Sequence, residues 1–261
     1  MCFYNRKINK RIKVILVMEV YFMARRRTFA EQVLQFNAEI ANKSLTLPNG
    51  FETVNPFKGE QQELVRKVTA AFYEKYYSDF GSRRLILGSS PARRGSAVTG
   101  VPFEDAKHLQ METGIIIDKF LTNQSSAGFL YDVISEYGGT TKFYSDFYMN
   151  FVCPLGIVKI NSKGKEVNCN YYEDKKLQAA LYPFIVSTIR SQLDFRIDTS
   201  LCYCIGSGEN YSFLSKLNNE YHFFDKIIPL EHPRFIMQYN SRRKALFIEK
   251  YIKALSDNVN V

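Results

Sequence analysis

The sequence predicts an α/β fold of three layers, in which a central, mainly parallel sheet of four strands is covered by helices on both faces. Short apolar runs that are typical of buried strands alternate along the chain with longer amphipathic segments that are typical of helices. Strands separated by helices form parallel sheets with both faces covered. The length of 261 residues and the hydrophobic content of 46% are enough for one large core.

The expected elements follow one another in a regular order. Thr28 can cap a first helix over 28–43, whose apolar stripe is Phe29, Val33, Phe36 and Ile40. Further helices are expected at 64–76, 127–137, 177–192, 211–217 and 245–255. Strands are expected at 85–87, 147–154, 201–206 and 227–228.

The loop over 88–103, GSSPARRGSAVTGVPF, is the most informative segment. It follows the strand at 85–87, and ligands of open α/β sheets bind outside the carboxyl ends of such strands. The loop has neither the Lys-Ser/Thr pair of a phosphate-binding Walker loop nor the dinucleotide-binding glycine pattern. We therefore expect a binding site of another kind here.

This loop resembles motif 1 of the uracil-DNA glycosylase superfamily, in its single-strand-selective monofunctional (SMUG-type) branch. The pattern is G-x-N-P-x-x-x-G-x-x-x-T-G-x-P-F, and Ser90 occupies the position of the family's catalytic Asn. The fixed positions that match are Gly88, Pro91, Gly95, Thr99, Gly100, Pro102 and Phe103.

Three further blocks resemble the same superfamily in the order that it requires. NFVCPL at 150–155 is similar to the second-strand block, but Phe151 stands where the family has a base-reading Asn, and Asn150 lies one residue earlier. Side chains alternate between the faces of a strand, so either a bulge re-aims Asn150 or the base is read differently. LCYCIGSG at 201–208 is similar to the third strand and its Gly-x-Gly exit, and EHPRF at 231–235 to the His-Pro loop of motif 2. The blocks HPRFIMQYNSRRK and NYYEDKKL look closest to a second SMUG-like subfamily.

The resemblance implies a set of site residues. The expected catalytic residues are His232, as a hydrogen-bond donor to the departing base, and Ser90, as a replacement for the Asn that holds the attacking water. The expected base-binding residues are Phe103, Asn150, Phe151, Gly88 and Ser89. The expected DNA-binding residues are Arg93, Arg94, Gly206, Ser207, Gly208, Pro233 and Arg234. We expect no metal and no cofactor.

Each of these residue types also has a simpler explanation. His232 alone is compatible with a hydrogen-bonded loop histidine, and Phe103 with a core residue behind a turn. Arg93 and Arg94 can be solvated surface residues, and the basic run at 242–244 can decorate the start of a helix. Ser90 is shorter than Asn, has fewer hydrogen-bonding groups, and has no His or carboxylate beside it in the sequence.

The sequence therefore predicts a monofunctional DNA glycosylase that hydrolyses deaminated bases, uracil first, from DNA. The motifs contain no lysine that would cleave the backbone. The first alternative is a nucleic-acid-binding protein that kept the fold and lost turnover. The second is a hydrolase of free nucleosides, which would not need the arginines of motif 1.

Charge and cysteine content support a DNA-binding protein of a reducing compartment. The net charge is +9, of which residues 1–22 carry +4 (five basic residues against Glu19), so about +5 remains for phosphate contacts. We expect 1–27 to be a non-native or disordered extension, with Met23 as a plausible start, and 28–261 to be a single domain. A secretory signal at 1–24 is the alternative, but Glu19 interrupts its apolar run and no small-residue cleavage site follows.

The five cysteines form no Cys-x-x-Cys pair and do not describe a disulfide framework or an iron–sulfur site. With three histidines in the chain, a structural zinc site is not expected either. We expect a cytoplasmic monomer with DNA as its partner and no membrane association. Aromatic residues are abundant, with 17 Tyr and 21 Phe, and suit both a core and a surface that stacks bases.

Overall fold

The structure, a computed structural model, describes residues 27–256 except 119, 121, 123 and 124. The proposed extension at 1–27 therefore lies outside the described residues apart from Arg27. The helices are α2 (Phe29–Asn42), α3 (Gln62–Tyr77), α4 (Ser96–Thr99), α5 (Ala106–Thr113), α6 (Ser125–Tyr137), α7 (Thr140–Asp146), α8 (Lys175–Leu193), α9 (Glu209–Tyr221), α10 (Pro233–Tyr239) and α11 (Lys244–Ser256), with a 3₁₀ turn at Ser241–Arg243.

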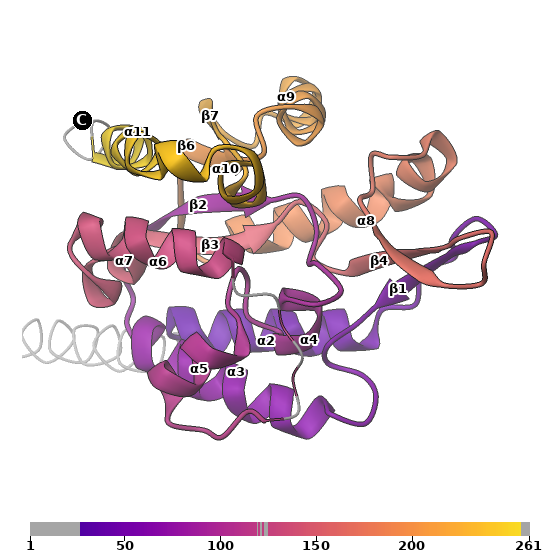
Figure 1. Ribbon diagram of the computed structural model, residues 1–261, viewed down its shortest axis with the longest axis horizontal. Coiled ribbons are helices and arrows are strands. Elements are labelled where there is room, and N and C mark those ends of the chain that lie inside the picture. Colours follow the sequence, from indigo (N-terminus) through magenta and orange to yellow (C-terminus); the bar gives the residue numbers. More distant parts are fainter. Residues whose placement is uncertain (1–26, 119, 121, 123–124, 257–261) are drawn as a thin grey trace, which may run out of the picture.

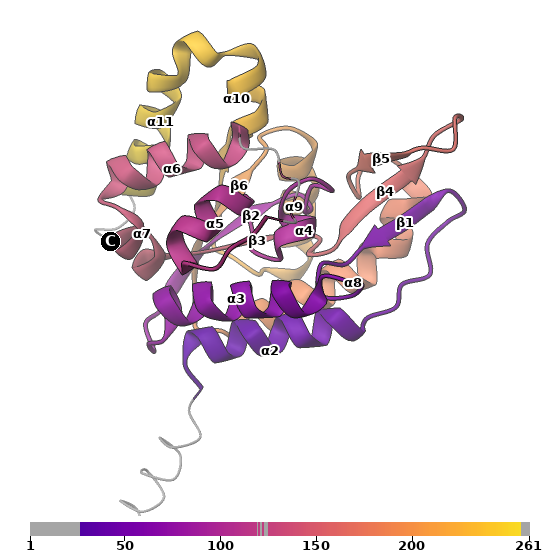
Figure 2. The same ribbon diagram turned by 60° about the horizontal axis from the view of Figure 1, so that its bottom comes forward.

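Four strands form the predicted parallel sheet. They are β2 (Arg83–Gly88), β3 (Phe147–Phe151), β6 (Ile197–Ile205) and β7 (Lys226–Leu230), in the order β3-β2-β6-β7. Every neighbouring pair in this sheet is parallel. Helices α2 and α3 lie on one side of the sheet, and α6, α10 and α11 lie on the other (Figures 1 and 2). The predicted α/β fold class is confirmed.

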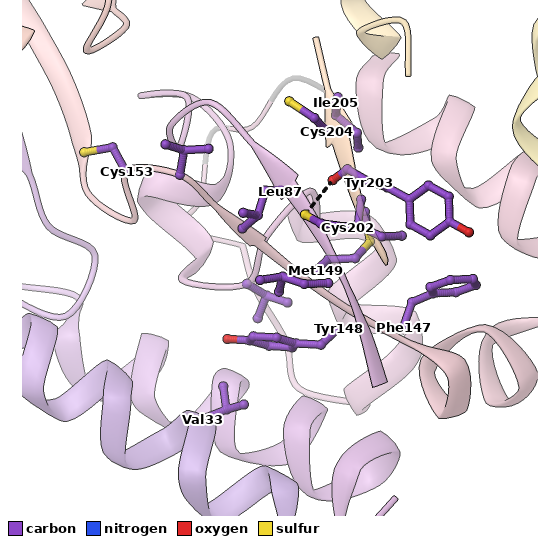
Figure 3. Packing of buried hydrophobic residues seen from close by; sticks show 14 of the residues in the cluster. Val33, Leu87, Phe147, Tyr148, Met149, Cys153, Cys202, Tyr203, Cys204 and Ile205 are labelled. Atoms are coloured by element: carbon purple, nitrogen blue, oxygen red, sulfur yellow. Dashed lines mark hydrogen bonds between the residues drawn. The ribbon is translucent and has the colours of Figure 1, made fainter. Parts of the chain in front are cut away.

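Alternation along β3 builds the core on both faces of the sheet. Tyr148 points toward α2, where its ring lies 5.2 Å from that of Phe29, and Phe147 points to the opposite face, 5.7 Å from the ring of Tyr203 (Figure 3). All five residues of β3 are buried, although β3 is an edge strand of this sheet, because helices cover both faces.

The first helix begins where the sequence predicts. The Thr28 side chain accepts a hydrogen bond from the Glu31 N–H, and the Glu31 carboxylate accepts one from the Thr28 N–H, so the two residues form a capping box. The predicted apolar stripe of this helix is buried. Helices α8 and α9 are longer than predicted, and α8 contains Pro183.

A second, antiparallel sheet was not predicted. It consists of β1 (Phe51–Val54), β4 (Gly156–Ile160) and β5 (Glu166–Cys169), in the order β1-β4-β5. The predicted strand over 147–154 is wrong in its extent, because β3 ends at Phe151 and the chain turns into β4. These strands are short, and those at the edges are largely exposed, so they lack the apolar alternation that identifies a strand from sequence.

Candidate functional site

The carboxyl ends of all four parallel strands lie at one edge of the sheet. Gly88 at the end of β2 pairs with Phe151 at the end of β3, and Ile205 at the end of β6 pairs with Leu230 at the end of β7. The motif 1 loop, the Gly-x-Gly turn and the His-Pro loop therefore leave the sheet on the same side. Strand β6 lies between β2 and β7, so motif 1 and the His-Pro loop lie on either side of the carboxyl end of β6. At the usual strand spacing, the ends of β2 and β7 are roughly 10 Å apart.

Gly88 lies under a pair of stacked rings. The rings of Phe103 and Phe151 are stacked, with centroids 5.0 Å apart and an angle of 27° between their planes. A Cβ atom at position 88 would lie 2.5 Å from Cζ of Phe103 and 2.9 Å from Cδ1 of Phe151. The absence of a side chain at Gly88 is thus what lets the two rings meet over the end of β2.

The backbone of Phe103 is held in the left-handed region, with φ at 63°, which is unfavourable for an aromatic residue. Its N–H donates to Oγ of Ser96 at 2.8 Å. The next residue, Glu104, is buried, and its carboxyl group accepts hydrogen bonds from the hydroxyls of Tyr131 and Tyr144. Burial raises the pKa of Glu104 to about 8 despite these two hydrogen bonds. These contacts hold the backbone at Phe103 and Glu104 in place.

Asn150 does not face the same way as Phe151. The pairing of β3 with β2 runs without a register shift from Phe147 to Phe151, so no bulge re-aims the side chain. The Asn150 amide donates to the hydroxyl of Tyr148 at 2.7 Å and accepts from the Phe151 N–H at 2.9 Å. The side chain is buried and lines a pocket beneath the motif 1 loop that is also lined by residues of α2 and α3. The bulge that the sequence raised as one alternative is therefore not present between Phe147 and Phe151.

Ser89 and Ser90, the adjacent serines of motif 1, are buried and share one hydrogen-bond partner. The hydroxyls of Ser89 and Ser90 donate to Oδ1 of Asn170, at 2.9 and 3.1 Å. The main-chain oxygens of Gly88 and Ser89 accept hydrogen bonds from the N–H groups of Val152 and Cys153. The start of the motif 1 loop is therefore tied both to the end of β3 and to the loop after β5.

His232 is the N-cap residue of α10, and its tautomer follows from that role. Its Nδ1 atom accepts a hydrogen bond from the Arg234 N–H at 3.0 Å, so the ring proton of the neutral imidazole lies on Nε2. Burial, together with the positive charge of Arg234, lowers the pKa of His232 to about 4. At neutral pH this residue is an uncharged donor.

The remaining predicted DNA-binding residues surround this edge. Arg94, Ser207, Gly208 and Arg234 are exposed, whereas Pro233 is buried at the start of α10. Gly206 has φ at 105°, a conformation that favours glycine, and its N–H donates to the Leu230 oxygen. Arg93 is half-buried, lies 3.7 Å from the Glu166 carboxylate and donates its backbone N–H to Asn168. The cationic groups that remain most open are Arg94 and Arg234.

Sequence reasoning missed two features of the site. Asn170 belongs to the NYYEDKKL block, but nothing in the sequence signals that it meets motif 1. Phe235 and Tyr239 are exposed on α10 with ring centroids 6.0 Å apart, and the i, i+4 spacing of two aromatic residues beside the His-Pro loop is a signal that could have found them.

In the part of the chain that the structure describes, no group of three or more His, Cys, Asp or Glu side chains could hold a metal ion. Four cysteines, Cys153, Cys169, Cys202 and Cys204, are free thiols that are buried, and burial raises the pKa of Cys153 to about 12. Cys2 lies outside the described residues. Among the described helices, none is both long enough and apolar enough to span a bilayer.

Comparison with known proteins identifies relatives of this chain. A model of the uracil DNA glycosylase superfamily matches residues 74–256. Among solved structures, the chain is similar to wild-type SMUG2 of Pedobacter heparinus, with 45% sequence identity and a TM-score of 0.85. The match covers 90% of this chain and 100% of that one. No curated protein matches the chain.

A methyl group at Gly88 should disrupt the stacked rings above it. We expect Gly88→Ala to lower the free energy of unfolding by about 1–3 kcal/mol, because the added carbon overpacks the site. Gly128→Ala in α6 is the matched control, since its added methyl meets nothing within 4 Å. Urea unfolding monitored by circular dichroism measures both. Equal stability of the two variants would contradict the close packing around Gly88.

The lowered pKa of His232 predicts how stability depends on pH. Between about pH 6.5 and about pH 4 the unfolded chain binds a proton on this residue and the folded chain does not, so stability is lost as the pH falls through this range. We expect the midpoint of thermal unfolding to fall more steeply there in the wild type than in His232→Asn, whose amide oxygen can replace Nδ1 as the N-cap acceptor but does not titrate. Parallel curves for the two proteins would contradict the burial of a neutral imidazole.

Proposed function

The chain belongs to the uracil DNA glycosylase superfamily, and we propose that it hydrolyses the N-glycosidic bond of uracil in DNA as a monofunctional base-excision glycosylase. We extend the proposal to other deaminated bases, with uracil as the first substrate. The observation that carries it is the neutral His232 across the β6 exit from motif 1, with its ring proton on Nε2.

The reaction separates charge between the sugar and the base, and the site supplies groups that act on each of them. The bond between C1′ and the base breaks with its electron pair going to the base, so the sugar becomes cationic and uracil leaves as an anion. The oxygen of a water molecule bonds to C1′, and the proton that it loses is taken up through solvent, which also protonates the departing uracil. A neutral donor at Nε2 of His232 strengthens its hydrogen bond to the uracil oxygen as negative charge develops there. Such preorganised donors are worth about 3–4 kcal/mol each.

Motif 1 would bind the extruded base and the water. The Phe103 ring, held over Gly88 and backed by Phe151, offers a face for a base that has left the helical stack. Ser89 lies beside this platform. Ser90 would hold the water that the family's Asn holds. Since the Asn150 amide is bonded to Tyr148, we propose that groups of the motif 1 loop take part in reading the base edge.

The DNA backbone would contact the cationic and glycine-rich parts of this edge. We propose phosphate contacts for Arg93, Arg94 and the Gly206–Ser207–Gly208 turn, and insertion of Arg234 next to Pro233 into the gap left by the extruded nucleotide. The motifs hold no lysine that would cleave the backbone, so the product would be an abasic site. We further propose that the protein acts as a cytoplasmic monomer without a cofactor.

The replacement of Asn by Ser90 favours one alternative, a lesion-binding protein with the same fold and little turnover. The Ser90 hydroxyl has fewer hydrogen-bonding groups than an asparagine amide, so it binds a water molecule less firmly unless other groups orient it. A hydrolase of free nucleosides is the third possibility, and it leaves the exposed Arg94 and Arg234 without a role.

One assay distinguishes these functions. A labelled oligonucleotide with a single uracil is incubated with the protein and then treated with alkali, and wild type is compared with His232→Asn, His232→Ala and Ser90→Ala. We expect strand cleavage only after alkali, and a rate reduced by roughly a hundredfold or more when the Nε2 donor is removed.

Ser191→Ala on α8 is the control, since its hydroxyl bonds only within its own helix. Tight, salt-sensitive binding without cleavage on uracil, hypoxanthine or xanthine would favour the binding protein. Activity on free deoxyuridine alone would contradict both DNA-directed functions.

A further inference from the structure

Ser89 and Ser90, the adjacent serines of motif 1, share a partner that comes from a distant part of the chain. Asn170 directly follows β5, and its Oδ1 atom accepts the hydroxyl protons of both Ser89 and Ser90. On the other side, Nδ2 of Asn170 donates to the Glu173 carboxylate at 2.9 Å. A chain of hydrogen bonds therefore runs from Ser90 through Asn170 to Glu173.

Glu173 determines which way the Asn170 amide faces. An ionised carboxylate only accepts hydrogen bonds, so the NH₂ group of the amide must point toward it. The oxygen of the amide then points toward the serines. The Glu173 carboxylate also accepts from the Asn170 backbone N–H at 2.8 Å, and the Glu173 N–H donates to the Asn170 main-chain oxygen at 3.1 Å. The side chain and the backbone of Asn170 are thus both fixed by Glu173.

The residue after Asn170 anchors this loop to the rest of the site. Tyr171 is fully buried, and its hydroxyl donates to Oδ1 of Asn210 at 2.7 Å. The amide nitrogen of Asn210 in turn donates to the Ile205 oxygen at the end of β6, at 2.9 Å. The position of Asn170 is therefore coupled to the sheet edge on which the motifs converge.

The direction of these hydrogen bonds changes the chemical character of Ser90. A free serine hydroxyl can donate or accept, and a water molecule beside it has no fixed orientation. Because the Ser90 proton is held by Asn170, the lone pairs of Oγ are what remains for a further ligand. In this state the hydroxyl resembles the amide oxygen of an asparagine, which also accepts hydrogen bonds.

We propose that Asn170, fixed by Glu173, is a positioning residue that makes Ser90 an obligate acceptor for the attacking water. The proposal rests on the glycosylase function proposed above. It assigns to the loop after β5 the task of supplying the amide that motif 1 lacks at position 90, although Asn170 itself need not touch the substrate.

A double-mutant cycle tests this role. The single-turnover rate on a uracil-containing oligonucleotide is measured for wild type, Asn170→Ala, Ser90→Ala and the double variant, and DNA affinity is measured for each. Loss of one oriented hydrogen bond should slow Asn170→Ala by roughly tenfold, with little change in affinity. In the Ser90→Ala background the same change should slow the reaction less than roughly twofold, because no hydroxyl remains to be oriented.

Two further variants separate this role from a structural one. Asn161→Ala removes an asparagine from the β4–β5 turn of the same small sheet and should leave the rate unchanged. Glu173→Gln keeps the shape of the loop but frees the Asn170 amide to rotate, so it should slow the reaction of the wild type. In the Ser90→Ala background the same substitution should not slow the reaction further. If Asn170→Ala unfolds, as its thermal melting would show, Glu173→Gln carries the test.

The outcomes distinguish the two proposals. Suppose that the wild type is active. If Asn170→Ala and Glu173→Gln do not slow the reaction, or slow it equally in the wild-type and Ser90→Ala backgrounds, the role of Asn170 is overturned and the glycosylase function is left intact. A wild type without activity on uracil overturns the proposed function and this inference together.

Discussion

The position of β2 between two parallel neighbours is the constraint on which the candidate site depends. Its pairing with β3 places Gly88 opposite Phe151, and its pairing with β6 places Leu87 opposite Cys204. These registers decide that motif 1 leaves the sheet beside the end of β3 and next to the Gly-x-Gly turn. A shift of either register by one residue would exchange the side chains that pack on the two faces of the sheet and would move Gly88 away from Phe151, so packing of the core and assembly of the site are enforced together.

The small antiparallel sheet gives the site a second support. Because β4 follows β3 directly and pairs with β5, the chain returns to the sheet edge with Asn168 and Asn170 facing the motif 1 loop. Asn168 accepts the Arg93 backbone N–H, while Asn170 accepts the two serine hydroxyls. A sheet with exposed edges thereby contributes polar side chains to the motif 1 loop, and the Ser90 hydroxyl is bonded to an amide from another loop.

The sequence reasoning succeeded where the information is local. The four parallel strands, the capped first helix and the glycine-rich loop each follow from a pattern within a few residues. The partner of Ser90 lies 80 residues away, and its approach depends on a sheet whose strands carry no apolar alternation. The tautomer and the protonation state of His232 were equally out of reach, because the first depends on the hydrogen bond by which the ring caps α10 and the second on the burial that lowers its pKa. For Asn150, period-2 alternation predicts that its side chain and that of Phe151 face opposite ways, and the continuous register shows no bulge that would change this.

A crystal structure with DNA that contains 2′-fluoro-2′-deoxyuridine tests the placement of Phe103, His232 and Ser90 around the base, since the fluorine disfavours the cationic sugar and so slows bond cleavage. We expect an extruded uracil on the Phe103 ring, with Nε2 of His232 within about 3.2 Å of a uracil oxygen. We also expect a water molecule that donates to Oγ of Ser90. A complex in which the nucleotide stays in the helical stack, or in which Nε2 of His232 points away from the base, would contradict the proposed function.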